Sequence, residues 1–149
     1  MSEVYEAHGA RSIDDIITMS VNSVSAHYSK GRSILVYCHD PKLANKFSER
    51  LWSKDDCNFI PHYFAGDDIV IPPRIIICNE DINDWFKKLN PQPYFLLNLS
   101  TDYLKEATLF ENILEFVMSE SESKRLARDR VLKYKQDGHE IKYFEFKYN

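Results

Sequence analysis

The segment Ser33-Ile34-Leu35-Val36-Tyr37-Cys38 is almost continuously apolar. Such a run, without the polar residues that alternate along a half-exposed strand, is typical of a strand covered on both faces of a parallel sheet. Asp40 and Pro41 follow directly and are residue types that favour a helix N-cap and a first helical turn. Apolar residues then recur at helical spacing, at Leu43, Ala44, Phe47 and Leu51. The segment therefore predicts a central parallel strand that leads straight into a helix.

The same alternation of strands and helices continues on both sides of this segment. The other expected elements are a strand at Glu3–Ala7, a helix from a Ser12–Asp15 capping box to Lys30-Gly31, strands at Arg74–Cys78 and Pro93–Leu97 with a helix at Asp81–Leu89 between them, and an edge strand at Ile141–Tyr148. Residues 53–73 predict loops around one short strand, and residues 109–117 fit a helix almost as well as the strand that we favour. This order predicts one α/β domain over residues 1–149, a Rossmann-like three-layer α/β/α sandwich with a mostly parallel sheet.

The composition is that of a soluble, acidic protein. The 149 residues are 44% hydrophobic and 13% aromatic, which is ample for a packed core. A net charge of −4 argues against a surface that coats nucleic acid or an anionic membrane. The three cysteines are widely spaced and form no CxxC, so we expect neither a disulfide framework nor structural zinc. Because the chain has no signal-like N-terminus and no long apolar run, we expect a cytoplasmic protein without a membrane partner.

The strongest concentration of positive charge lies in a predicted helix that follows Ser119–Ser123 and stops at Gly138. Its cations are Lys124, Arg125, Arg128, Arg130, Lys133 and Lys135. At about 100° per residue, one narrow sector holds Lys124, Arg128, Val131 and Lys135, and the adjoining apolar side holds Leu126, Ala127, Val131 and Tyr134. This surface suits a ligand with both carboxylates and an apolar end. From the helix alone, a solvated face over a core is the more common explanation.

No pattern in the chain predicts an active site. At the end of the central strand, Cys38, His39 and Asp40 include a nucleophile and a base, but adjacent side chains on a strand point apart. His62, Asp67 and Asp68 are metal-ligand types without a third fixed spacing, and turn formation is the simpler interpretation of the two aspartates. With four glycines and neither GxGxxG nor GxxxxGK[ST], the sequence lacks a phosphate cradle. We therefore expect no cofactor and no metal.

Two groups of residues, taken together, resemble one protein family. The first is Leu51-Trp52, followed after six residues by Phe59-Ile60-Pro61-His62 and then by Ala65-Gly66-Asp67. The second is Ala127-Arg128-Asp129-Arg130, Tyr134, Gly138-His139 and Tyr143. In this order, and in a chain of this length, they resemble the chi subunit of the bacterial DNA polymerase III holoenzyme. The resemblance covers essentially the whole chain.

The resemblance implies a non-enzymatic adaptor of the clamp loader in DNA replication. Chi subunits bind the acidic C-terminal tail of single-stranded DNA-binding protein, which ends in an aromatic residue with a free carboxylate. They also bind the psi subunit, where one exists. Arg128 matches the family's tail-binding arginine, and the other expected contacts are Lys124, Val131, Leu132, Lys135 and Val117. This chain has Val131-Leu132 where an aromatic and a basic residue often stand.

The other family positions are equally consistent with a partner surface and with a structural corner; they are Leu51, Trp52, Phe59, Pro61, His62, Gly138 and His139. One alternative function is a nucleotide-binding hydrolase or transferase that uses Cys38 to Asp40 with His62 and Asp67. Another is direct binding of single-stranded DNA by the Lys124–Lys135 helix. The acidic net charge and the lack of aromatic residues interleaved with these cations disfavour the latter, so we expect contact with DNA to be mainly indirect.

Overall fold

The computed structural model describes residues 2–53, 60–68 and 73–145. These residues form a seven-stranded sheet with the order β3-β4-β2-β5-β6-β1-β7, and all of its pairings are parallel. The strands are β1 (Glu3–Ala10), β2 (Ser33–Tyr37), β3 (Tyr63–Phe64), β4 (Ile75–Cys78), β5 (Pro93–Asn98), β6 (Asn112–Met118) and β7 (Glu140–Glu145). The predicted parallel sheet is thus confirmed.

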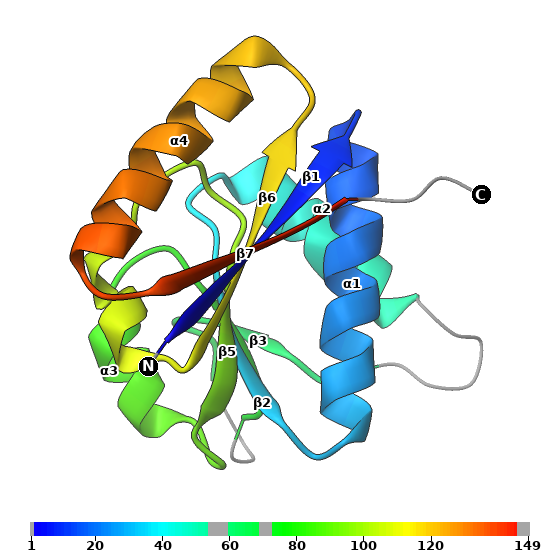
Figure 1. Cartoon of the computed structure of the whole chain (residues 1–149). Helices are drawn as coiled ribbons and strands as arrows, with labels where there is room; N and C mark the ends of the chain where they lie inside the picture. Colours follow the sequence, from blue (N-terminus) through cyan, green and yellow to red (C-terminus); the bar gives the residue numbers. More distant parts are fainter. Residues whose placement is uncertain (1, 54–59, 69–72, 146–149) are drawn as a thin grey trace.

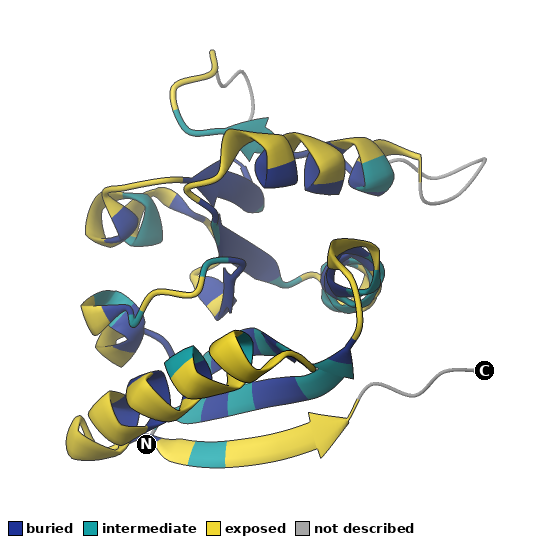
Figure 2. Cartoon of the chain, turned by 90° about the horizontal axis from the view of Figure 1, so that it is seen from above, coloured by how far each residue is buried: buried dark blue, intermediate teal, exposed yellow. Residues whose placement is uncertain are grey.

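Helices cover both faces of this sheet (Figure 1). They are α1 (Ile13–Ser29), α2 (Pro41–Trp52), α3 (Ile82–Lys88) and α4 (Ser121–Gln136), with a short 3₁₀ helix, η1 (Lys105–Leu109). One hydrophobic core lies between the sheet and α1 with α2, and a second lies between the sheet and α3, η1 and α4. In Figure 2 each helix turns its buried side to the sheet and its exposed side outward. The predicted three-layer α/β/α sandwich is therefore confirmed.

The central strand and the helix after it form as their sequence predicts. β2 lies between β4 and β5 and is covered on both faces, with Ile34, Leu35 and Val36 fully buried. Asp40 caps α2, because its carboxylate accepts a hydrogen bond from the Lys42 amide at 3.0 Å. The expected N-cap of α1 is present as well, since the Ser12 hydroxyl accepts from the Asp15 amide at 3.2 Å.

Several boundaries differ in detail from the prediction. Residues 109–117 are mainly strand, as favoured, but η1 ends at Leu109 and β6 begins only at Asn112. The final edge strand is β7, which ends at Glu145 within the described residues. Phe59, one of the family positions, lies outside them. Among the described helices, none has both the length and the apolar character needed to cross a membrane.

The basic C-terminal helix is α4, which packs across β6 and reaches the edge of the sheet beside β7. Ala127, Val131 and Tyr134 form its buried side, as the apolar periodicity predicts. Gly138 ends the helix with a φ of +93°, a left-handed conformation that suits glycine, and its amide donates to the Lys135 carbonyl at 3.0 Å. This stop turns the chain back into β7, which pairs with β1. A groove lies between α4 and the neighbouring strands β1 and β7.

Candidate functional site

The groove beside α4 has a volume of about 520 Å³. It is lined by Lys124, Ala127, Arg128, Val131 and Leu132 of α4, by Glu6 and His8 of β1, and by Tyr143 of β7. Val131 is largely buried, whereas the Leu132 side chain is 61% exposed. Lys124, Arg128 and Leu132 follow one another at four-residue spacing along α4, and all three are exposed. The groove therefore combines an apolar surface with positive charge, the combination that the helical periodicity predicts.

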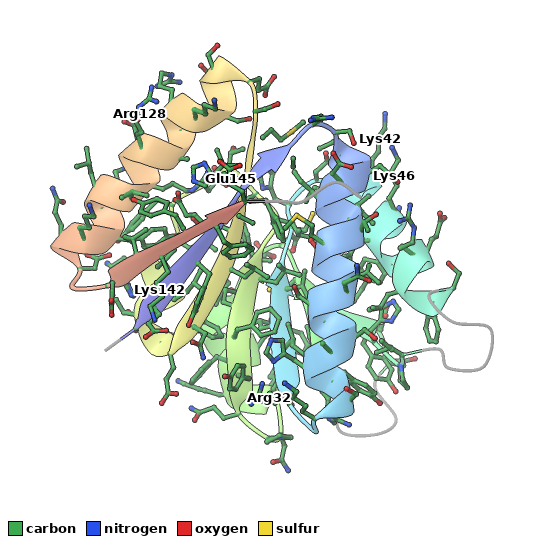
Figure 3. All side chains as sticks on the ribbon, turned by 45° about the vertical axis from the view of Figure 1, so that its right-hand side comes forward. Arg32, Lys42, Lys46, Arg128, Lys142 and Glu145 are labelled. Carbon is green, nitrogen blue, oxygen red and sulfur yellow. The ribbon has the colours of Figure 1, made fainter. Side chains whose placement is uncertain are left out.

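The cations of α4 differ in whether their charge is already matched. Arg125 forms ion pairs with Glu122 at 2.6 Å and with Asp129 at 3.4 Å. Lys124 and Arg128 have no such partner within residues 2–53, 60–68 and 73–145, and Arg128 projects from α4 into solvent (Figure 3). These two unpaired cations are the two that line the groove. Their charges are available to an anionic ligand.

Arg130 is one of the six cations of the predicted helix, but it does not lie on the helix surface. Its side chain is only 4% exposed, and its Nε donates to the Glu115 carboxylate at 3.0 Å. Its Nη1 donates to the Thr101 carbonyl at 2.9 Å. The second Glu115 oxygen accepts from the Tyr134 hydroxyl at 2.6 Å and from the Asn98 amide at 2.8 Å. Arg130 therefore anchors α4 to β6 and does not contribute to the surface charge.

Two of the predicted contact residues do not line the groove. Val117 is 1% exposed on β6 and lies on the same side of that strand as Glu115, so it is a core residue beneath α4. Lys135 is exposed, but it lies on the turn of α4 that follows Val131 and Leu132. The structure thus brings together Arg128, Lys124, Val131 and Leu132, and it leaves Val117 and Lys135 outside the groove.

The floor of the groove holds residues that the sequence analysis did not single out. Glu6 is 1% exposed, and its Oε1 accepts a hydrogen bond from His8 Nε2 at 3.1 Å. The His8 ring lies against the Tyr143 ring, with 5.7 Å between their centroids. Burial and, to a smaller extent, the nearby Glu115 carboxylate raise the pKa of Glu6 above its usual value. The sequence contains one signal for this site: Glu6 is an acidic residue at a position of the predicted strand Glu3–Ala7 that faces the core.

The first family segment forms a corner at the C-terminal end of α2. Leu51 is fully buried, and the Trp52 ring is 44% exposed and lies 4.5 Å from the His62 ring. His62 is buried; its Nδ1 donates to the Ile60 carbonyl at 2.8 Å, and its Nε2 accepts from the Ser48 hydroxyl at 2.7 Å. Burial lowers the pKa of His62, which agrees with this neutral tautomer. His62 thus holds the loop against α2, with the partly exposed Trp52 ring packed beside it.

The last two family positions lie where α4 turns into β7. Beyond Gly138, the His139 amide donates to the Tyr134 carbonyl at 3.0 Å. The His139 ring is buried and packs edge-on against the Tyr134 ring, with 5.5 Å between centroids. Burial lowers the pKa of His139. Both residues therefore shape the end of the helix.

The residues considered for catalysis do not converge on one site. Cys38 is buried, and burial raises the pKa of its thiol to about 11, so it is not an activated nucleophile. His39 lies 3.6 Å from Asp102, and Asp40 caps α2. The Asp67 carboxylate accepts from the Phe64 amide at 2.8 Å, as expected for a turn. Over the described ranges, no group of three or more His, Cys, Asp or Glu side chains is arranged to hold a metal ion.

Comparison with known proteins confirms the family resemblance. Residues 6–142 match the family described as DNA polymerase III chi subunit, HolC. DNA polymerase III subunit chi of Escherichia coli is 29% identical over 119 residues, which are 74% of this chain and 72% of the relative. The Haemophilus influenzae subunit is also 29% identical over 119 residues, covering 79% and 76%. The Pseudomonas aeruginosa subunit is 24% identical over 114 residues, covering 76% and 75%.

Proposed function

The chain belongs to the DNA polymerase III chi subunit family, and on that premise we propose that it is an adaptor between the clamp loader and single-stranded DNA-binding protein. In this proposal, the groove beside α4 binds the acidic C-terminal tail of the single-stranded DNA-binding protein. The protein contributes no catalytic residue of its own, and it takes part in replication by connecting other proteins. Its contact with DNA is mainly indirect.

One observation carries the proposal: Lys124 and Arg128, which have no ion-pair partner among the described residues, line the same groove as the exposed Leu132. The tail has the matching chemistry, because aspartates precede an aromatic residue with a free carboxylate. The Arg128 guanidinium is suited to bind that carboxylate with two parallel hydrogen bonds, since its planar fork matches a carboxylate. Lys124 supplies a second positive charge for an aspartate. Val131 and Leu132 then cover the aromatic ring.

The direct test is isothermal titration of the protein with a synthetic peptide in which aspartates precede a C-terminal phenylalanine. Arg128→Ala should weaken binding by about 30-fold, because a charge-assisted hydrogen bond to a carboxylate contributes ~2 kcal/mol. Arg125→Ala is the matched control, since Arg125 is on the same helix but already paired with Glu122 and Asp129. Absence of binding by the wild type, or equal effects of the two substitutions, would refute the proposed site.

The same titration at several salt concentrations tests the electrostatic part of the proposal. Binding should weaken as salt rises, because Lys124 and Arg128 are exposed and their attraction for the tail is screened. The salt dependence should be smaller in Arg128→Ala, which lacks one of the two charges. A salt dependence that Arg128→Ala leaves unchanged would place the anion-binding site elsewhere.

An adaptor needs a second surface, and we assign it to the corner at Trp52. This corner lies at the β3 edge of the sheet, whereas the groove lies beside β7 at the opposite edge. Partners at the two places would not compete for space. The half-exposed Trp52 ring is the residue type that most often anchors a protein interface. The psi subunit of the clamp loader, where present, is the partner proposed for this corner.

A further inference from the structure

Two buried carboxyl groups lie next to each other under α4, on neighbouring strands of the sheet. Glu6 of β1 and Glu115 of β6 are register partners, and both are at most 1% exposed. Glu115 receives three donors, from Arg130, Tyr134 and Asn98. Glu6 receives only His8, and its second oxygen, Oε2, is buried without a hydrogen-bond partner among the residues that the structure describes. Glu6 is therefore the less stabilised of the two carboxylates.

Glu6 also forms part of the groove in which the tail is proposed to dock. The titratable or charged groups around it are His8 on its own strand, Glu115 on β6, Tyr143 on β7, and Lys124, Arg128 and Arg130 on α4. In the free protein, the hydrogen bond from His8 and the positive charge of Arg130 favour the ionised form of Glu6. Burial and Glu115 favour the neutral form. The proton on Glu6 is thus held by a balance between opposing groups.

A bound anionic segment changes this balance in one direction. The carboxylates of the segment bring negative charge into the groove that Glu6 lines, and this charge disfavours the ionised form of Glu6. The segment also excludes water from the groove, which makes a buried charge less favourable. Both effects favour addition of a proton to the free Oε2 of Glu6. The neutral carboxyl group no longer repels the segment.

We propose that Glu6 is a specificity-determining residue of the groove, which couples docking of an anionic segment to uptake of a proton. This inference rests on the proposed function, because it takes the tail as the segment. By linkage, tail affinity rises as pH falls through the range in which Glu6 takes up its proton. At higher pH the ionised Glu6 keeps the groove selective, because it weakens the binding of anions that do not also bury an apolar end.

The experiment is isothermal titration of the full chain with the aspartate–phenylalanine peptide, in buffers of different ionisation enthalpy, from pH 5 to pH 8. The dependence of the binding enthalpy on the buffer gives the number of protons taken up. We expect roughly half a proton or more at the pH of greatest uptake, and several-fold tighter binding at pH 5 than at pH 8. In Glu6→Gln the uptake should disappear, and binding at pH 8 should become several-fold tighter.

His8→Gln is the control variant, since His8 is the residue that hydrogen-bonds the Glu6 carboxyl group. His8→Gln should keep the proton uptake, because the titrating carboxyl group is still present. If Glu6→Gln keeps the uptake, or if His8→Gln abolishes it, the inference is wrong. Binding without any proton uptake in the wild type overturns the inference but leaves the proposed function standing. If the wild type does not bind the peptide at any pH, the proposed function fails and the inference fails with it.

A second measurement does not depend on the folding of a variant. The carbon-13 signal of the Glu6 carboxyl group can be followed by NMR in the wild type during a pH titration, with and without the peptide. The titration midpoint should move to higher pH when the peptide is bound. A midpoint that stays in place would contradict the coupling.

Discussion

Arg130 and Arg128 allow a stringent test, because they are the same residue type on the same helix but lie in opposite environments: Arg130 is buried and paired with Glu115, and Arg128 is exposed. Arg130→Met keeps most of the aliphatic stem and removes the guanidinium. The change deletes the 3.0 Å bond to Glu115 and the 2.9 Å bond to the Thr101 carbonyl. It also leaves one oxygen of a fully buried carboxylate without a donor.

The expected cost follows from these contacts. Breaking a buried ion pair by removing one partner typically costs ~3–5 kcal/mol. Glu115 keeps its bonds to Tyr134 and Asn98, so we expect the lower end, ~3 kcal/mol. For a chain of this size, a loss of that magnitude corresponds to a fall in melting temperature of roughly 6–12 °C.

The assay is urea unfolding followed by circular dichroism, with Arg128→Met as the matched control. Arg128 is exposed and unpaired within the described part of the chain, so its substitution should not change the unfolding midpoint measurably. Arg130→Met should unfold at a clearly lower urea concentration with an unchanged slope. If Arg130→Met is as stable as the wild type, or if both variants are equally destabilised, the division into an anchoring and a ligand-binding arginine is wrong.

Two further predictions concern the groove and the response to pH. Leu132→Ser should weaken binding of the tail peptide by roughly 5- to 30-fold, because it removes apolar surface that the peptide would cover. It should not change stability, because Leu132 is 61% exposed in the free protein. Unchanged affinity in the same titration would exclude Leu132 from the binding site. His62 and His139 have pKa values lowered by burial, so the unfolded state binds more protons. Their contribution to stability should be lost as pH falls from about 7 towards 5. Urea unfolding midpoints at pH 7.5 and pH 5 measure this loss of stability. The loss should be smaller in His139→Leu, which lacks one of the two buried histidines. An equal loss in this variant would show that His139 does not contribute to the pH dependence of stability.

The fold was predictable because its signals are local. The uninterrupted apolar run of β2 and the capping residues Ser12 and Asp40 each act within a few positions of the chain. A doubly covered parallel sheet follows once strands of that kind alternate with helices of suitable length. The prediction was ambiguous for residues 109–117. This segment contains the end of the 3₁₀ helix η1 at Leu109 and, after two residues, the start of strand β6 at Asn112.

The groove was predictable only in part, since α4 supplies five of its eight lining residues and β1 and β7 supply the others. The periodicity of α4 predicted that Lys124, Arg128 and Val131 lie together, and all three line the groove. The same periodicity also carried a signal for Arg130, which stands three residues after Ala127 and four before Tyr134, both on the buried side. The count of six cations on the helix does not show that Arg130 belongs to the buried side.

The rest of the groove depends on contacts between distant parts of the chain. Glu6 reaches the floor because β1 lies between β6 and β7, more than one hundred residues away in sequence. Val117 lies beneath α4 and not in the groove, because the alternation of β6 directs it to the core together with Glu115. Neither placement follows from local sequence, because both depend on which strands become neighbours.

The central claim is that the groove beside α4 holds the tail of single-stranded DNA-binding protein. Its most direct test is the affinity of this protein for intact single-stranded DNA-binding protein, compared with the same partner lacking its last residues. We predict that removal of the tail abolishes binding, and that Arg128→Ala weakens binding to the intact partner while Arg125→Ala does not. Equal binding of the intact and the shortened partner would contradict the claim.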